Sequence, residues 1–251
     1  IVVNAPPVIT PTSGTTTYIE NATPIAVDST LTLNDIDSAQ LTGATIEITT
    51  NFVSGQDTLT FTTQNGISGT WNAGSGMLTL SGNASVADYQ SALRSITYAN
   101  SSDAPTTTTR TVTFAATDGI AASNLATRDV AVTALNDVPT GTVTISGTLM
   151  QNQTLTANNT LADADGLGTI SYQWQANGTD ITGATGTTYI LTGAEVNKTI
   201  TVVASYTDGH GTPESVTSAP TAAVTSLNDE EVLSTNTGMT VSEGALNSVI
   251  D

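Results

Sequence analysis

Residues 111–119 read Thr-Val-Thr-Phe-Ala-Ala-Thr-Asp-Gly, and residues 199–209 read Thr-Ile-Thr-Val-Val-Ala-Ser-Tyr-Thr-Asp-Gly. In both stretches, apolar residues alternate with Thr or small residues before an Asp-Gly pair. Period-two alternation is typical of a half-buried strand, and Asp-Gly is typical of the turn that ends one. Similar short runs, rich in Thr, Val and Ile, fill the chain. They predict an all-β protein built from many short antiparallel strands.

Helix-forming patterns are scarce in this chain. Ser85-Val-Ala-Asp88 has the form of a capping box, and Val86, Tyr89 and Leu93 would share one face of a short helix that follows it. Thr192-Gly-Ala-Glu195 repeats the capping pattern on a smaller scale. The sequence therefore predicts a short helix inserted in the first half of a β-protein.

The two opening stretches belong to a longer internal repeat. Each is followed by one further strand and then by Leu-Asn-Asp, at residues 135–137 and 227–229. Each is preceded by an Asp-x-Asp triplet, at residues 35–37 and 163–165. The order of the three motifs is the same in both halves. The repeat predicts one domain over residues 1–137, a second over residues 138–228, and the truncated start of a third over residues 229–251.

The charge balance is strongly acidic, with 22 Asp and Glu against 4 Lys and Arg and a net charge of −18. Nucleic acid as a partner is excluded, because phosphate binding needs clustered basic side chains. The chain has no Cys, and no apolar run approaches the roughly 20 residues of a membrane-spanning helix, so no membrane insertion is expected. Monovalent salt in a halophile or divalent cations bound between carboxylates could each balance the acidic surface.

The Asp-x-Asp triplets offer the chemistry that calcium requires. Alternate residues of an extended loop project to one side, so Asp35 with Asp37, and Asp163 with Asp165, can present two carboxylates to one ion. Calcium takes six to eight oxygen ligands, whereas two bare carboxylates about 4 Å apart repel by roughly 4 kcal/mol at an effective dielectric constant near 20. The alternative is plain turn chemistry, since Asp-Gly and Asn-Asp are common turn formers. Recurrence of all three motifs in one order favours Ca2+ as a cofactor.

The same residues resemble a known family. Ala116-Thr-Asp118-Gly, a strand, and then Leu135-Asn-Asp-Val-Pro139 resemble the closing half of a cadherin repeat. Tyr18-Ile-Glu20-Asn-Ala is similar to the Glu-Asn opening of that family. Both halves look like the cadherin-like and immunoglobulin-like repeats of large secreted bacterial surface adhesins. The resemblance implies two tandem Greek-key β-sandwich domains, the first with the helix insertion, in an extracellular protein at the cell surface.

In that family calcium lies between consecutive domains, and neighbouring repeats of the same chain are the partners. The resemblance implies a central junction of Glu20, Asn136 and Asp137 from the first domain with Asp163, Asp165 and Asp208 from the second. It places Asp35, Asp37 and Asp118, with Asn4, at the opposite end of the first domain, and Asn228 and Asp229 at the end of the second. The second domain departs from the family in opening with Gly141-Thr-Val-Thr-Ile instead of Glu-Asn. One or two ions at the central junction are therefore expected.

These observations predict a calcium-binding extender or adhesion module that is not an enzyme. No Gly-x-Ser-x-Gly elbow accompanies His210, the single histidine, which is interpreted as a loop residue. One alternative is a calcium-dependent carbohydrate-binding module with Trp71 as an exposed platform, although packing of Trp71 on a hairpin is favoured. Another is homophilic adhesion between cells, that is, calcium-dependent self-association. Trp174 shares one strand parity with Ile170 and Tyr172 and is predicted to fill a core.

Overall fold

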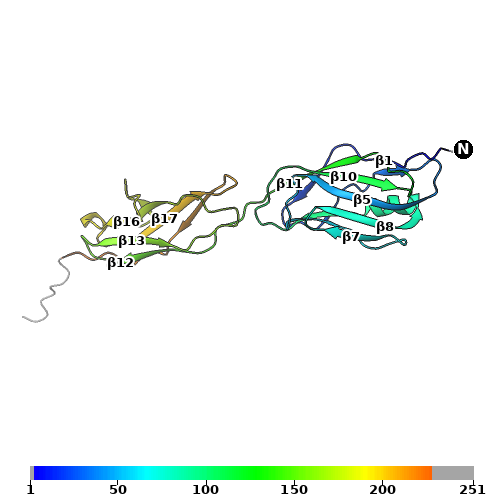
Figure 1. The fold of residues 1–251 in the computed structure, drawn as a ribbon. Coiled ribbons are helices and arrows are strands. Elements are labelled where there is room, and N and C mark those ends of the chain that lie inside the picture. The colour runs from blue at the N-terminus through cyan, green and yellow to red at the C-terminus, as the bar shows by residue number, and fades with distance from the viewer. Residues whose placement is uncertain (1–2, 228–251) are drawn as a thin grey trace, which may run out of the picture. The chain divides into compact units, whose positions relative to one another are not determined.

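The computed structural model describes residues 3–227, and the fold is all-β, as the alternation predicts. The chain divides into two compact units, Ile1–Asp137 (unit 1) and Val138–Asp251 (unit 2). Each unit has its own β-sheets (Figure 1). Each also has its own cluster of buried hydrophobic side chains. The predicted third unit begins at residue 229, outside the described residues.

Unit 1 contains eleven strands and one α-helix. Their bounds are β1 (Val8–Thr10), β2 (Thr15–Ile19), β3 (Ile25–Ala26), β4 (Thr32–Asn34), β5 (Gln40–Thr50), β6 (Asp57–Thr60), β7 (Ser68–Asn72), β8 (Met77–Ser85), α1 (Val86–Arg94), β9 (Thr97–Asn100), β10 (Arg110–Thr117) and β11 (Ala126–Thr133).

The strands of unit 1 form a six-stranded sheet in the order β2-β11-β10-β5-β8-β7 and two smaller sheets, β1-β4 and β3-β9-β6. Alternate residues of β10 are buried, which places Val112 and Phe114 on the inner face of the large sheet. Leu33 of β4 and Tyr98 of β9 enter the same core from the smaller sheets. Burial of one face of each sheet explains why the period-two pattern predicts these strands.

Helix α1 begins as the capping box predicts. Ser85 is its N-cap, and the Ser85 side chain accepts a hydrogen bond of 3.1 Å from the backbone N–H of Asp88. Tyr89 and Leu93 are buried one turn apart and attach the helix to the core of unit 1.

Unit 2 is described through Leu227 and has seven strands and one 3-10 helix in that part. Their bounds are β12 (Val143–Gly147), β13 (Thr154–Asn159), β14 (Ser171–Ala176), β15 (Thr179–Asp180), β16 (Thr188–Ile190), η1 (Gly193–Glu195), β17 (Ile200–Thr207) and β18 (Pro213–Thr217). The strands form two sheets in the orders β12-β13-β16 and β15-β14-β17-β18.

Trp174 of β14 is fully buried in the core of unit 2, which confirms the parity argument. Its indole N–H donates to the carbonyl of Gly186 at 2.9 Å, so the one polar atom of the side chain is satisfied. The ring of Tyr189 lies 5.9 Å from it, centroid to centroid. Thr192 and Glu195 form the second predicted capping box, which begins the 3-10 helix η1.

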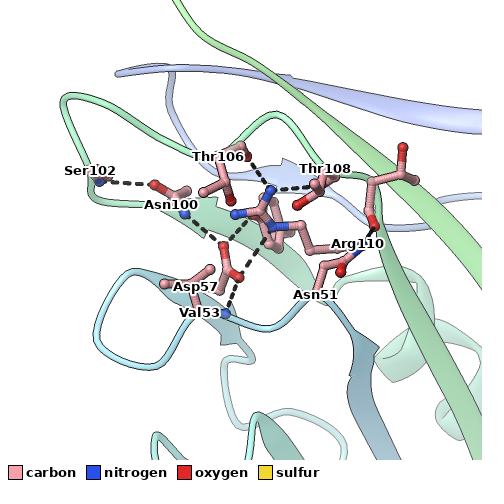
Figure 2. Close-up of polar contacts among 10 residues, drawn as sticks. Asn51, Val53, Asp57, Asn100, Ser102, Thr106, Thr108 and Arg110 are labelled. Atoms are coloured by element: carbon pink, nitrogen blue, oxygen red, sulfur yellow. Dashed lines mark hydrogen bonds and ion pairs between the residues drawn. The ribbon is translucent and has the colours of Figure 1, made fainter. Parts of the chain in front are cut away.

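The core of unit 1 holds an ion pair that the sequence analysis missed. Arg110 and Asp57 have fully buried side chains, and Nε of Arg110 lies 3.3 Å from Oδ2 of Asp57. Figure 2 shows that the guanidinium group also reaches back to the chain just before β10, where Nη1 donates to the carbonyls of Thr106 and Thr108. The pair therefore fixes an otherwise irregular segment, residues 101–109, against the core.

Asp57 is surrounded by donors besides the guanidinium group (Figure 2). Its Oδ1 accepts from the Tyr98 hydroxyl at 2.5 Å and from Nδ2 of Asn100 at 2.7 Å, and its Oδ2 accepts from the backbone N–H of Val53 at 2.8 Å. Burial, together with the hydrogen bond to the Asp57 carboxylate, raises the pKa of Tyr98 far above its ordinary range. Tyr98 thus stays protonated and keeps donating to Asp57.

Candidate metal centres

One group of predicted ligands meets at one end of unit 1, where three loops converge. Oδ1 of Asp35 accepts the backbone N–H groups of Asp37 (3.2 Å) and Ser38 (3.0 Å), so the Asp-x-Asp triplet closes on itself as a turn. The backbone N–H of Ala5 donates a hydrogen bond of 2.9 Å to Oδ2 of Asp37, and Nδ2 of Asn4 donates one of 2.8 Å to Oδ2 of Asp118. These bonds join the loops of Asp37 and Asp118 to the segment at Asn4 and Ala5, and Oγ of Ser38 donates to Oδ2 of Asp118 at 3.4 Å. That Asp35, Asp37, Asp118 and Asn4 share a metal ion stays a prediction. We call these four residues the unit 1 cluster.

Within the unit 1 cluster, Oδ2 of Asp35 is a buried oxygen with no hydrogen-bond partner. A carboxylate oxygen removed from water without a donor is costly, because the lost hydration is not replaced. A hard cation such as calcium, which takes carboxylate oxygens as ligands, would satisfy this oxygen.

Among the carboxylates of this cluster, Asp118 accepts the most hydrogen bonds. The backbone N–H groups of Ala121 and Ile120 donate to its Oδ1 at 2.7 Å each, and these bonds, followed by that from Asn4, lower the pKa of Asp118 from 3.8 to about 2. The carboxylate is thus charged at any neutral pH, which is the state that a cation ligand needs.

The lowered pKa of Asp118 predicts a pH dependence of the folding stability of unit 1. A carboxyl group with a depressed folded-state pKa stabilises the fold above its ordinary pKa, and this contribution is lost as the pH falls from 3.8 to about 2. We expect Asp118→Asn to be less stable than the parent at pH 6, and the difference to shrink as the pH approaches 2. Urea unfolding across this range measures it, with Asp103→Asn, a change at an exposed carboxylate, as the control. A difference that is the same at pH 6 and pH 2 would contradict the assignment.

The corresponding loops of unit 2 also meet. The backbone N–H of Gly209 donates to the carbonyl of Asp165 at 3.0 Å, which joins the Asp-x-Asp loop to the Asp-Gly loop after β17. Asp165 and Asp208 are both buried, and Nδ1 of His210 lies 2.8 Å from Oδ1 of Asp165. Tyr206 donates to Oδ2 of Asp163 at 2.5 Å. We call Asp163, Asp165 and Asp208, with His210, the unit 2 cluster.

Asp208 repeats the feature seen at Asp35. Its Oδ1 accepts the N–H groups of His210 (2.9 Å) and Thr212 (2.7 Å), whereas its Oδ2 is buried and has no hydrogen-bond partner. Although burial alone would raise the pKa of Asp208, these backbone donors outweigh it and lower the pKa below 3.8. Burial and the hydrogen bond to Asp163 raise the pKa of Tyr206 well above its ordinary range, so its hydroxyl remains a donor. Asp35 in unit 1 and Asp208 in unit 2 therefore each have a buried carboxylate oxygen without a hydrogen-bond partner.

Glu20, Asn136 and Asp137 are the other predicted ligands in unit 1, and they are not part of the unit 1 cluster. Glu20 directly follows β2, is buried, and accepts the backbone N–H of Leu135 at 2.8 Å through Oε2. Asn136 is exposed and Asp137 is half-buried in the segment that ends unit 1. The sharing of ions between these residues and the unit 2 cluster stays a prediction. Asn228 and Asp229 lie outside the described residues.

Carboxylates alone do not complete a metal site in either cluster. Within residues 3–227, no three Asp, Glu or His side chains form a group that would hold a metal ion by themselves. A calcium ion here would need further oxygens from amide side chains such as Asn4, from backbone carbonyls or from water, all of which are ordinary calcium ligands. The residues present fit part of such a shell, and the buried oxygens of Asp35 and Asp208 are the atoms that it would use first.

Trp71 lies on β7 and is half-buried. It packs against the core of unit 1, and its ring makes an edge contact with Phe52 at a centroid distance of 6.2 Å. This is the hairpin packing that the sequence analysis favoured, and it gives no support to an exposed sugar platform.

The geometry defines an all-β protein whose units each carry a cluster of acidic loops. Halomucin of Haloquadratum walsbyi is 37% identical to the chain over an alignment of 101 residues, and the match covers 38% of this chain and 1% of halomucin. The chain therefore matches only about a hundredth of the length of that relative. No family model matches the chain, and its resemblance to cadherin repeats stays a prediction.

A solved structure of a marsupial T cell receptor covers 86% of this chain and 100% of its own chain, with 9% sequence identity and a TM-score of 0.23. A score this low carries no argument about the fold. Among the described residues, no helix is long and apolar enough to cross a membrane.

Proposed function

We propose that this chain is a calcium-binding extender from a large cell-surface protein, and that its role is mechanical rather than catalytic. The observation that carries the proposal is that acidic loops recur in both units and that, in each unit, one of these loops has a buried carboxylate oxygen that lacks a donor. In unit 1 it belongs to Asp35 of the Asp-x-Asp loop, and in unit 2 to Asp208 of the Asp-Gly loop. Turn formation does not need these oxygens, because the turns use the other oxygen of each carboxylate. A bound cation would be a binding partner for the second oxygen of each carboxylate, which takes no part in the turn.

The surface-associated part of the proposal has separate support. The partial match to halomucin, a large surface protein, is compatible with a surface-associated role for this chain. The net charge of −18 also fits a surface that stays hydrated and does not bind anionic membranes. Extracellular calcium sites bind with dissociation constants of roughly 10⁻⁴ to 10⁻³ M, so fluid outside the cell would keep them filled.

Thermal and urea unfolding with calcium and with chelator test the proposal. If the dissociation constant is in that range, 10 mM calcium stabilises a unit with one site by about 1.4–2.7 kcal/mol, because binding to the folded state adds RT ln(1 + [L]/Kd) to its stability. We expect Asp35→Asn with Asp37→Asn to remove the effect in unit 1, and Asp163→Asn with Asp165→Asn to remove it in unit 2.

Two controls separate a bound ion from general charge screening. Sodium chloride at the same ionic strength replaces calcium, because screening depends on ionic strength and not on the ion's fit. Asp103→Asn with Asp129→Asn removes the same charge from exposed positions of unit 1. Equal stabilisation by sodium chloride, or identical curves with calcium and with chelator, would leave the acidic residues as solvating groups and end the proposal.

A further inference from the structure

β2, the second strand of unit 1, lies next to β11, its last strand, and the two run in the same direction. β2 pairs with β11 in parallel over five residue pairs, from Thr15 with Asp129 to Ile19 with Thr133. The pairing continues past the strand ends, because the backbone N–H of Glu20 donates to the carbonyl of Thr133 at 2.9 Å. We call this pairing the terminal clamp.

Parallel terminal strands have a defined response to force. When the two ends of unit 1 are pulled apart, the force on the amino end acts first on the three-residue pairing of β1 with β4 and then on β2. β2 is drawn towards its amino end and β11 towards its carboxyl end, so the two strands slide past each other. The hydrogen bonds between them lie across the direction of pull and share the load together. Opening therefore requires several bonds to break at once, which slows forced unfolding.

Arg128 of β11 reinforces the clamp from the side. Its Nη1 donates to the carbonyls of Thr12 (2.6 Å) and Gly14 (2.7 Å), and its Nε donates to Oγ1 of Thr16 at 3.1 Å. One guanidinium group thus connects β11 to the segment that leads into β2. Hydrogen bonds from a charged donor are about twice as strong as neutral ones, so these bonds stabilise the terminal clamp at the amino end of β2.

In its described part, residues 138–227, unit 2 has a much shorter version of the same contact. Its last described segment meets its first part in a single parallel bridge, Met150 with Thr225, with backbone bonds of 2.9 Å from Gln151 to the Thr225 carbonyl and from Thr225 to the Leu149 carbonyl. Fewer bonds share the load there.

We infer that unit 1 is the mechanically more resistant unit of this chain and that unit 2 unfolds first under tension. The inference rests on the proposed extender role for its biological meaning, but its physical basis is the strand pairing and does not involve calcium. A chain built in this way lengthens in steps, because unit 2 extends while unit 1 still holds.

Single-molecule force spectroscopy on the whole chain, held at its two ends in chelator, tests the order. The two units are told apart by length, since release of residues 8–133 gives roughly 430 Å of chain and release of residues 143–225 roughly 280 Å at about 3.4 Å per residue, before the folded lengths are subtracted. We expect the shorter step, which is the unfolding of unit 2, to occur at the lower force. If the longer step, which is the unfolding of unit 1, occurs at an equal or lower force, the inference is overturned by the unmodified chain alone.

A matched pair of arginine variants tests the clamp itself. At constant force, Arg128→Gln should raise the unfolding rate of unit 1 about tenfold and leave unit 2 unchanged, since it removes charge-assisted bonds across the clamp. Arg94→Gln is the control, because Nε of Arg94 also donates to a backbone carbonyl, that of Leu31 at 2.7 Å, away from the clamp. Equal effects of the two variants on the unfolding rate of unit 1, or no effect of Arg128→Gln, would overturn the proposed role of the terminal clamp. A missing calcium effect in the unfolding experiments, with the order of steps preserved, would remove only the calcium proposal.

Discussion

Arg110→Met is expected to destabilise unit 1 by about 3–5 kcal/mol. Removing one member of a buried ion pair leaves the other charge in a site from which water is excluded, and that cost exceeds what the intact pair contributes. Asp57 would remain fully buried without its cation, and the carbonyls of Thr106 and Thr108 would lose their donor. Met has similar length and keeps most of the packing.

Urea unfolding followed by tryptophan fluorescence measures this loss. The chain has one tryptophan in each unit, so in a Trp174→Phe background the signal comes from Trp71 and reports unit 1. The double variant Arg110→Met with Asp57→Asn should lose less than the sum of the two single changes, because the uncompensated charge is gone. A single-variant loss below about 1 kcal/mol would mean that water reaches the pair and that it does not fix residues 101–109.

Trp174→Ala is expected to destabilise unit 2 by about 3–5 kcal/mol, the usual range for truncating a buried aromatic residue. The side chain is fully buried, the ring of Tyr189 packs on it, and the carbonyl of Gly186 accepts its N–H. Truncation leaves a cavity and also an acceptor without its donor.

Calorimetry or circular dichroism measures this effect, because the variant removes the fluorescent reporter of unit 2. Trp71→Ala in unit 1 is the comparison, since Trp71 is only half-buried and should cost less. Each change should shift only the transition of its own unit. A Trp174→Ala loss no larger than that of Trp71→Ala would contradict the core role of Trp174.

Much of the local structure could be predicted because it depends on residues close together in the sequence. The alternation in residues 111–117 and 199–207 matches β10 and β17, and the capping residues Ser85 and Thr192 begin α1 and η1. The contacts that make these elements lie within a few residues, so the pattern of side chains is sufficient to indicate them.

The ion pair in the core could not be predicted in the same way. Arg110, Val112 and Phe114 are alternate residues of β10, so their side chains lie on the same face of the strand. This alternation was the one sign in the sequence that the Arg110 side chain points inward. A charged residue is nevertheless rarely buried without a partner. Its partner Asp57 is 53 residues away, on a different strand. No local pattern joins them, so the pairing became visible only with the sheets in place.

For the candidate site, the sequence by itself determined which residues carry oxygen ligands and that they recur in one order in both halves. Tertiary structure decided which of them meet: Asn4 reaches Asp118 across 114 residues, and His210 lies against Asp165. It also decided that β2 and β11 run side by side in parallel. The physical reason is that strand alternation and turn chemistry depend on a few neighbouring residues. Contacts between loops, and between strands as far apart in sequence as β2 and β11, depend instead on how the sheets pack into a common core.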